Sequence, residues 1–231
     1  MRCVPPNSQT SAAPFPAAFP TQGMHEIRSN ARRTFLQASL ATAGLAAIGG
    51  PSPADAAVAR PRTANLAIAV AARAGLERAG AAVDHRDVVA VADFAQPSRT
   101  PRLHLVDMTS GAVQTLWVAH GRGSDPARTG WLSRFSNDPG SDATSEGAYV
   151  TGGYYLGGHG PSMRLIGLDP TNSNAESRRI VVHAAWYVGP EILRTHGMLG
   201  RSEGCFAVSA TDLPAVLVRL GPGRLLIAGI V

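Results

Sequence analysis

The sequence predicts a mostly β domain with a few short helices, preceded by an N-terminal segment of different composition. From residue 88 onward, short β-branched or alternating apolar runs follow one another closely, separated by turns rich in glycine, serine and asparagine. Only residues 65–83 and 212–220 have helical character. Many short strands with few helices are typical of a β fold. The chain has 231 residues, 45% of them hydrophobic, which is enough for one substantial core.

Residues 1–57 are predicted to be an N-terminal extension followed by a twin-arginine signal peptide. Paired arginines at 32–33 precede Thr-Phe-Leu and an apolar run at 38–50, and small residues suitable for a signal peptidase follow. The run is too short and too rich in glycine and alanine to span a bilayer. We therefore expect export by the twin-arginine translocase, cleavage near residue 56 and no stable membrane span afterwards. An amphipathic or core helix is the alternative, and Met24 is a second possible start.

Residues 58–85 are predicted to be a linker and a packing helix. The alanine-rich stretch 65–83 carries apolar residues at helical spacing, with an interruption or an end expected at Gly75 or Gly80. No chemistry is assigned to this helix.

Residues 86–231 are predicted to form the main, mostly β domain. Its strands are expected at residues 88–94, 102–107, 112–119, 147–155, 163–168, 179–185 and 225–231. The second and third of these form a hairpin around the turn at 109–111. A helix is expected at 212–220, with Ser209 or Thr211 as its cap.

The charge of the chain gives no support to nucleic-acid binding. The formal net charge is +5, all 21 basic residues are arginine, and no basic stripe alternates with aromatic residues. A modest positive excess suits an anionic polymer or a carboxylated substrate.

The two cysteines, Cys3 and Cys205, differ in their expected fate. Cys3 lies in the segment that we expect to be removed, so one thiol remains in an exported protein. This excludes a disulfide framework and favours a reactive thiol. A buried structural cysteine is the alternative.

Cys205 has the neighbours that a cysteine nucleophile needs. A thiol attacks as its thiolate and requires a base, and His183, at the end of the predicted strand 179–185, is the candidate. Gly204 allows a sharp turn, after which the amides of Gly204 and Cys205 could form an oxyanion hole. A purely structural strand histidine is the alternative.

These residues resemble the catalytic motif of the cysteine L,D-transpeptidases (YkuD-like), a histidine followed by Ser/Thr-x-Gly-Cys. Here the motif consists of His183 and Ser202-Glu203-Gly204-Cys205. The resemblance to murein L,D-transpeptidase catalytic domains covers residues 86–231. It is carried by the segments 120–124, 135–137, 158–165 and 200–208.

The resemblance implies a cofactor-free enzyme with a β-sandwich-like domain that acts on peptidoglycan stem peptides, donor and acceptor, in the periplasm or extracytoplasmic envelope. Cys205 would attack the carbonyl of meso-diaminopimelate and release D-alanine, and an acceptor amine would complete a 3→3 crosslink. Water as acceptor would make the protein an L,D-carboxypeptidase. His183 would be the base, oriented through the carbonyl near Ala184. Many members have histidine where this chain has Glu203, whose carboxylate would raise the thiol pKa.

Four further residues are candidates for substrate binding. His159 is expected in a cleft wall, Arg164 or Arg201 could hold a substrate carboxylate in a bidentate pair, and Ser202 orients the loop before the thiol. The alternative is that His159 caps a turn and the arginines brace the fold.

Two other functions compete with the transpeptidase interpretation. One is a zinc enzyme, because the chain has seven histidines, but it has no His-Glu-x-x-His and no tight ligand pair, so we expect no metal. The other is a catalytically weak envelope module that binds peptidoglycan.

Overall fold

The computed structural model describes residues 62–231, which lie within one compact unit. The predicted extension and export signal at residues 1–57, including the alternative start at Met24, lie outside the described residues. Within residues 62–231 no helix is both long enough and apolar enough to cross a membrane.

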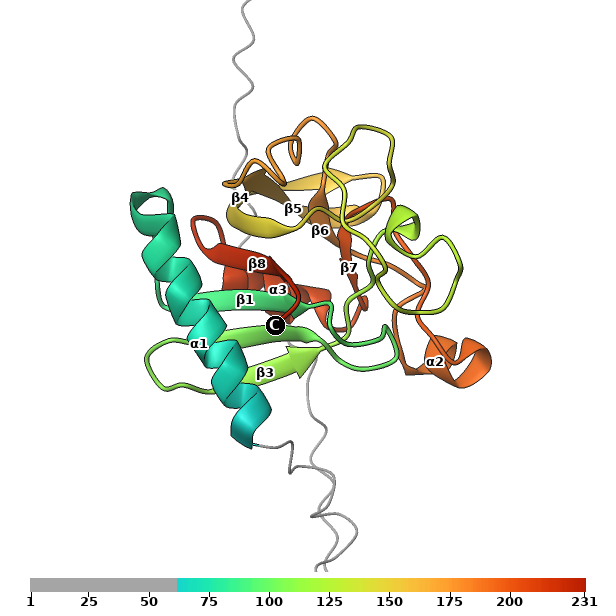
Figure 1. The fold of residues 1–231 in the computed structure, drawn as a ribbon, viewed down its shortest axis with the longest axis horizontal. Coiled ribbons are helices and arrows are strands. Elements are labelled where there is room, and N and C mark those ends of the chain that lie inside the picture. Colours follow the sequence, from blue (N-terminus) through green and yellow to red (C-terminus); the bar gives the residue numbers. More distant parts are fainter. Residues whose placement is uncertain (1–61) are drawn as a thin grey trace, which may run out of the picture. The chain divides into compact units, whose positions relative to one another are not determined.

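Eight strands of the described part form one sheet in the order β3-β2-β1-β8-β4-β5-β6-β7. The β1–β8 and β6–β7 pairs are parallel and the other pairs are antiparallel. The predicted mostly β class with a few short helices is thus confirmed (Figure 1). The strands are β1 (Val88–Asp93), β2 (Leu103–Asp107), β3 (Val113–Leu116), β4 (Gly147–Gly157), β5 (Gly160–Gly167), β6 (Val181–Ala184), β7 (Phe206–Val208) and β8 (Leu225–Gly229).

The sheet curls until the chain after one edge strand meets the other edge strand. Residues that follow β3 bridge to the region of β7, Ala119 to Ala207 and Gly121 to Ser202. The interior holds a cluster of aromatic and aliphatic side chains in which Phe206 lies 6.3 Å from Phe94 and 5.5 Å from Tyr149 between ring centroids. A single curled sheet therefore supplies the facing layers that a sandwich has, and its closure brings β6 and β7 beside the loop after β3.

Helix α1 (Arg62–Ala79) covers the outer face of the sheet (Figure 1). Ile68, Ala72 and Leu76 join a second apolar cluster with residues of β1, β2 and β8. The helix continues through Gly75, because a Cβ there would lie 2.3 Å from the Ile227 side chain, so glycine permits close contact with β8. It ends at Ala79, before Gly80 at φ +52° and a 3₁₀ turn over Gly80–Ala82.

Two elements were not predicted, α2 (Pro190–His196) and β7. Helix α2 is only two turns long, begins with proline and ends at Gly197 in the left-handed conformation, so it leaves little periodic signal. Strand β7 has three residues, all buried, which is too short a run to show alternation.

The second predicted helix is α3 (Leu213–Leu220), which packs on the core side of the sheet. The Ser209 hydroxyl accepts a hydrogen bond from the Asp212 N–H at 3.0 Å and donates one to the Asp212 carboxylate at 2.7 Å. The prediction of Ser209 or Thr211 as the cap is wrong, because the N-cap is Asp212 and no side chain caps this helix; Ser209 instead bonds Asp212 from just before the helix.

Candidate active site

The parallel pair β6–β7 brings Cys205 and His183 to one pocket. His183 lies opposite Ala207 in the strand register, and Cys205 precedes Ala207 by two residues, the spacing that returns a side chain to the same face of a strand. Both side chains line a pocket of about 650 Å³. Cys205 is partly exposed, whereas His183 is only 2% exposed. The thiol is therefore open to a ligand, and the imidazole lines the same pocket.

A hydrogen bond to the backbone selects the tautomer of His183. Its Nδ1 lies 2.8 Å from the carbonyl oxygen of Ala184. Because a carbonyl only accepts, Nδ1 carries the hydrogen and Nε2 has the free lone pair. Burial lowers the pKa of His183, the Ala184 carbonyl opposes this, and the neighbouring His159 lowers it further. The ring is therefore neutral at pH 7 and able to accept a proton.

The thiol of Cys205 is also neutral at rest. Its Sγ donates to the carbonyl oxygen of Arg179 at 3.5 Å. Burial raises the thiol pKa and the Glu203 carboxylate adds to the rise, while the Val181 backbone and the Arg178 charge lower it. The site thus holds a neutral thiol and a neutral imidazole, so proton transfer has to accompany attack.

The turn before the thiol depends on Gly204 and Ser202. Gly204 has φ +113°, and a Cβ there would lie 2.8 Å from the carbonyl oxygen of Ala143. The Ser202 hydroxyl donates to the carbonyl oxygen of Cys205 at 2.7 Å and accepts from the Gly204 N–H at 3.2 Å. The Gly204 amide thus has a partner in this structure, and it must leave Ser202 to act as the predicted oxyanion donor.

The loop after β3 is hydrogen-bonded to this turn through the backbone. The Ser202 N–H donates to the carbonyl oxygen of His120 at 3.0 Å, and the Arg122 N–H donates to the carbonyl oxygen of Ser202 at 2.7 Å. A Cβ on Gly121 would lie 2.8 Å from the Gly204 nitrogen, so the two glycine backbones are in direct contact. This contact explains why residue 121 is glycine.

A buried polar cluster holds that loop in place. Arg102 donates from Nη2 to His120 Nδ1 at 2.6 Å, and His120 Nε2 lies 3.8 Å from the Asp125 carboxylate. Burial lowers the pKa of Arg102 to about 9 and that of His120 to about 3, the latter with help from the Arg102 charge. His120 is therefore a neutral structural acceptor, which removes one of the histidines considered for zinc.

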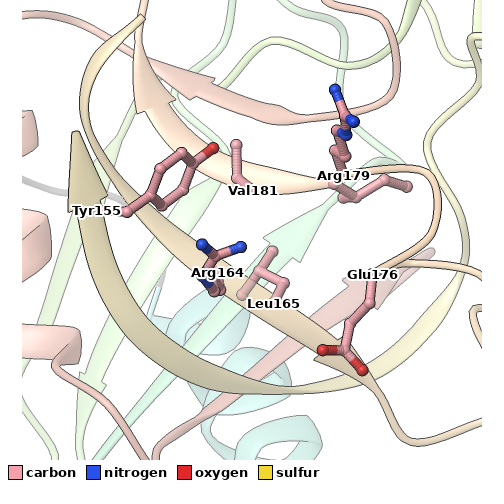
Figure 2. A pocket seen from close by; sticks show the side chains of 7 residues that line it. Tyr155, Arg164, Leu165, Glu176, Arg179 and Val181 are labelled. Atoms are coloured by element: carbon pink, nitrogen blue, oxygen red, sulfur yellow. The ribbon is translucent and has the colours of Figure 1, made fainter. Parts of the chain in front are cut away.

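Three of the predicted substrate residues line the pocket of Cys205, and the fourth does not. His159, at the tip of the β4–β5 hairpin, stacks on His183, and Ser202 and Arg201 are also in the lining. Arg201 donates from Nη1 to the carbonyl oxygen of Asp125 at 2.7 Å, so part of its guanidinium is committed to the fold. Arg164 lines a separate, adjoining pocket of about 360 Å³ (Figure 2).

Sequence reasoning missed Arg178 and Arg179. The Arg178 guanidinium donates to the carbonyl oxygens of Ser136 and Ala143 and to the Ser145 hydroxyl, and it lines the pocket of Cys205. Arg179 has φ +55° and directs its carbonyl oxygen at the thiol. The signal that could have identified them is two adjacent arginines directly before the buried run that carries His183.

Glu203 lies on the rim of the pocket and is 70% exposed. Its carboxylate is 3.2 Å from Arg122 Nη2, which also lies 2.8 Å from the Asp142 carboxylate. The rim beside Cys205 therefore carries two carboxylates that share one guanidinium.

Within residues 62–231 no three or more His, Cys, Asp or Glu side chains are grouped so that they could hold a metal ion.

A protein-family model described as the L,D-transpeptidase catalytic domain matches residues 62–228. Comparison with curated proteins gives no match.

Solved structures match at low sequence identity. An L,D-transpeptidase from Mycobacterium smegmatis is 15% identical, with 62% of this chain and 58% of that chain covered and a TM-score of 0.37. An L,D-transpeptidase from Mycobacterium tuberculosis H37Rv is 17% identical, with 62% and 57% covered and a TM-score of 0.40. The helical cell shape determining protein Pgp2 from Campylobacter jejuni is 13% identical, with 73% and 56% covered and a TM-score of 0.40. The chain thus spans less than two thirds of the length of each.

Proposed function

The chain belongs to the L,D-transpeptidase catalytic-domain family, and on that premise we propose that it is a peptidoglycan L,D-transpeptidase with Cys205 as nucleophile and His183 as base. The observation that carries the proposal is the position of both side chains in one pocket, with the Nε2 lone pair of His183 left free by its Nδ1 hydrogen bond. Peptidoglycan stem peptides are the proposed donor and acceptor.

The resting protonation states define the first chemical step. The S–H proton of Cys205 moves to Nε2 of His183 as the sulfur attacks the donor carbonyl, which forms a C–S bond and an oxyanion. The same proton then passes from Nε2 to the nitrogen of the departing D-alanine as the C–N bond breaks. The product is a thioester on Cys205, and the imidazole is neutral again.

The second step returns the acyl group to an amine. An acceptor amine attacks the thioester, His183 takes a proton from it, and the proton passes to sulfur as the C–S bond breaks. The new amide is the 3→3 crosslink. Water in place of the amine gives an L,D-carboxypeptidase, which is the alternative outcome of the same acyl-enzyme.

The oxyanion is assigned to the amides of Gly204 and Cys205. The Gly204 N–H bonds the Ser202 hydroxyl at 3.2 Å, which is near the long end of the range for such bonds. Exchange of this neutral acceptor for a developing oxyanion would give a stronger, charge-assisted bond in the transition state.

We also propose that the protein is exported through the twin-arginine pathway and acts in the periplasm or extracytoplasmic envelope, where its polymer substrate lies. A catalytically weak peptidoglycan-binding module remains the alternative from another functional class. The partial exposure of Cys205 in a pocket favours the enzyme.

The test is covalent labelling followed by product analysis. The purified chain is incubated with a carbapenem, and its intact mass is measured by mass spectrometry. A mass increase on Cys205 is expected. A folded protein that gains no mass would favour the binding module. Muropeptide analysis with and without an added acceptor amine then separates crosslink formation from hydrolysis.

A further inference from the structure

His120 is a fully buried histidine that takes no part in the proposed chemical steps. Its side chain has no exposed surface, and the ring of Phe94 packs edge-on against it with the centroids 6.2 Å apart. Arg102 donates from Nη2 to Nδ1 at 2.6 Å, so Nδ1 is an acceptor and Nε2 carries the hydrogen. That N–H has no hydrogen-bond partner among residues 62–231, because the Asp125 carboxylate is 3.8 Å away.

The unpaired N–H indicates which ring nitrogen of His120 contributes to the protein. A buried donor without an acceptor costs free energy. A phenylalanine ring would fill the same space without that cost, because it brings no polar atom into the interior. The imidazole therefore has to contribute through Nδ1, the ring nitrogen that has a partner.

The bond at Nδ1 is one of several through which Arg102 holds the segment after β3. Its Nε donates to the carbonyl oxygen of Val118 at 3.1 Å, and its Nη2 bonds the side chain of His120 two residues later. Between these two residues, the N–H of Ala119 donates to the carbonyl oxygen of Ala207 on β7 at 2.9 Å. The segment is thus fixed between a buried guanidinium on one side and β7 on the other.

The backbone of His120 is bonded to the turn that carries the thiol. Its carbonyl oxygen accepts the N–H of Ser202 at 3.0 Å. The Ser202 hydroxyl in turn accepts the N–H of Gly204 at 3.2 Å and donates to the carbonyl oxygen of Cys205 at 2.7 Å. Ser202 therefore connects the backbone of His120 to both residues whose amides are the proposed oxyanion donors.

We propose that His120 is a positioning residue for the oxyanion hole. Its Nδ1 bond to Arg102 fixes its side chain and hence its carbonyl oxygen, which fixes Ser202 and the direction of the Gly204 and Cys205 amides. An error of about 1 Å in such a positioned group can cost about 100-fold in rate. This inference rests on the proposed function, because an oxyanion forms only if Cys205 attacks a carbonyl.

The test compares two reactions of the same thiol in the full chain. Acylation by a carbapenem passes through an oxyanion, whereas alkylation by iodoacetamide forms a C–S bond and releases iodide and a proton without one. Both reactions require the thiol, but only acylation requires the oxyanion hole. Intact mass gives the rate constant of acylation at saturating carbapenem and the second-order rate constant of alkylation. A change in stability alone would not separate the two.

Three substitutions of His120 separate its size from its acceptor. His120→Phe keeps the ring and removes Nδ1, so acylation should slow by about 10- to 100-fold while alkylation is unchanged. His120→Asn places a carbonyl oxygen near the position of Nδ1 and should restore most of the acylation rate. His120→Gln carries its amide further out, toward the position of Nε2, and should not restore it.

His104→Phe is the matched control, since it makes the same change at another buried histidine, on β2. Nδ1 of His104 lies 3.0 Å from the Thr115 hydroxyl, so the control also removes a buried side-chain hydrogen bond. It should leave both rates unchanged, and near-ultraviolet circular dichroism confirms the fold of each variant. If His120→Phe does not fold, the comparison of His120→Asn with His120→Gln decides, because both keep a polar side chain.

Three results would overturn the inference: acylation at the original rate in folded His120→Phe, an equal fall of acylation and alkylation in that variant, or recovery in His120→Gln as complete as in His120→Asn. Failure of the proposed function would look different. In that case the unsubstituted chain would be alkylated on Cys205 but would gain no mass with a carbapenem.

Discussion

His159 stacks on His183, with the ring centroids 4.2 Å apart and the ring planes inclined at 23°. The first ring comes from the tip of the β4–β5 hairpin and the second from β6, so the contact depends on the position of the hairpin over the sheet. The stack covers the face of the proposed base, and it adds a second titratable group beside it. The hairpin therefore influences the protonation of His183 as well as the shape of the pocket.

The first prediction concerns this stack and the pH dependence of acylation. The proposed base works when neutral, so activity falls as the pH drops through the pKa of His183. Burial and His159 lower that pKa, so the stack extends activity toward lower pH. In His159→Ala the acidic limb of kcat/KM should move to higher pH. In His159→Phe, which keeps the burial and loses the charge, it should move less. An unchanged limb in both variants would contradict the role assigned to the stack.

The second prediction separates nucleophile from base. Cys205→Ala should abolish the covalent adduct seen by intact mass, because no other cysteine lies in residues 62–231 and Cys3 lies in the segment that we expect to be removed. His183→Gln should slow acylation by about 10²–10⁴-fold, the usual contribution of a general base, without loss of the fold. The near-ultraviolet circular dichroism of each variant is the control for folding. Adduct formation at the wild-type rate in His183→Gln would exclude His183 as the base.

The third prediction concerns Glu203 and thiol reactivity. Its carboxylate raises the pKa of Cys205, so Glu203→Gln should lower that pKa and increase the thiolate fraction at neutral pH. Alkylation by iodoacetamide should then become faster below the thiol pKa. The difference should shrink in high salt, because Glu203 is exposed and its charge is screened. Glu191→Gln, on exposed α2, is the matched control. Equal alkylation rates at low salt would show that the carboxylate has no effect on the thiol.

The fourth prediction compares two glycines with positive φ. Gly140→Ala should cost about 1–2 kcal/mol of unfolding free energy, since φ is +76° but no atom lies within 4 Å of the added Cβ. Gly204→Ala should cost more, about 3 kcal/mol or above, because the Cβ also meets the Ala143 carbonyl oxygen at 2.8 Å. Urea unfolding measures both. Acylation of Cys205 should be lost only in Gly204→Ala, and equal costs would contradict the packing explanation.

Local sequence patterns predicted most of the strands but not how the sheet closes. Apolar, β-branched or alternating runs marked β1, β2, β4 and β5. In the structure β1 is buried at every residue and β2 at its first four residues, so both strands are covered on two faces rather than buried at period two. The three-residue β7 and the two-turn α2 carry too few residues for a period. Strand β7 is defined by its partners from elsewhere in the chain, because it pairs with β6 and bridges to Ala119 after β3.

The predicted site residues were those whose chemistry is visible in the residue type. A lone thiol after glycine, with a histidine at a strand end, suffices to nominate Cys205 and His183. The sequence could not show which arginines bind substrate and which brace the fold, because an arginine pairs wherever the fold provides an acceptor. Arg201 donates to the carbonyl oxygen of Asp125, whereas the Arg164 guanidinium lies over the Tyr155 ring and lines a pocket together with Arg179.

The sequence by itself determined the proposed reactive groups, the family resemblance and the glycine that the turn requires, since these depend on residue types and short spacings. Only the tertiary structure decided that a second histidine stacks on the base, that Ser202 occupies the Gly204 amide, and that Arg178 braces the loop beside the thiol. The physical reason is that each of these contacts joins segments held together by the curled sheet. Their energies depend on distances that exist only after the sheet has closed.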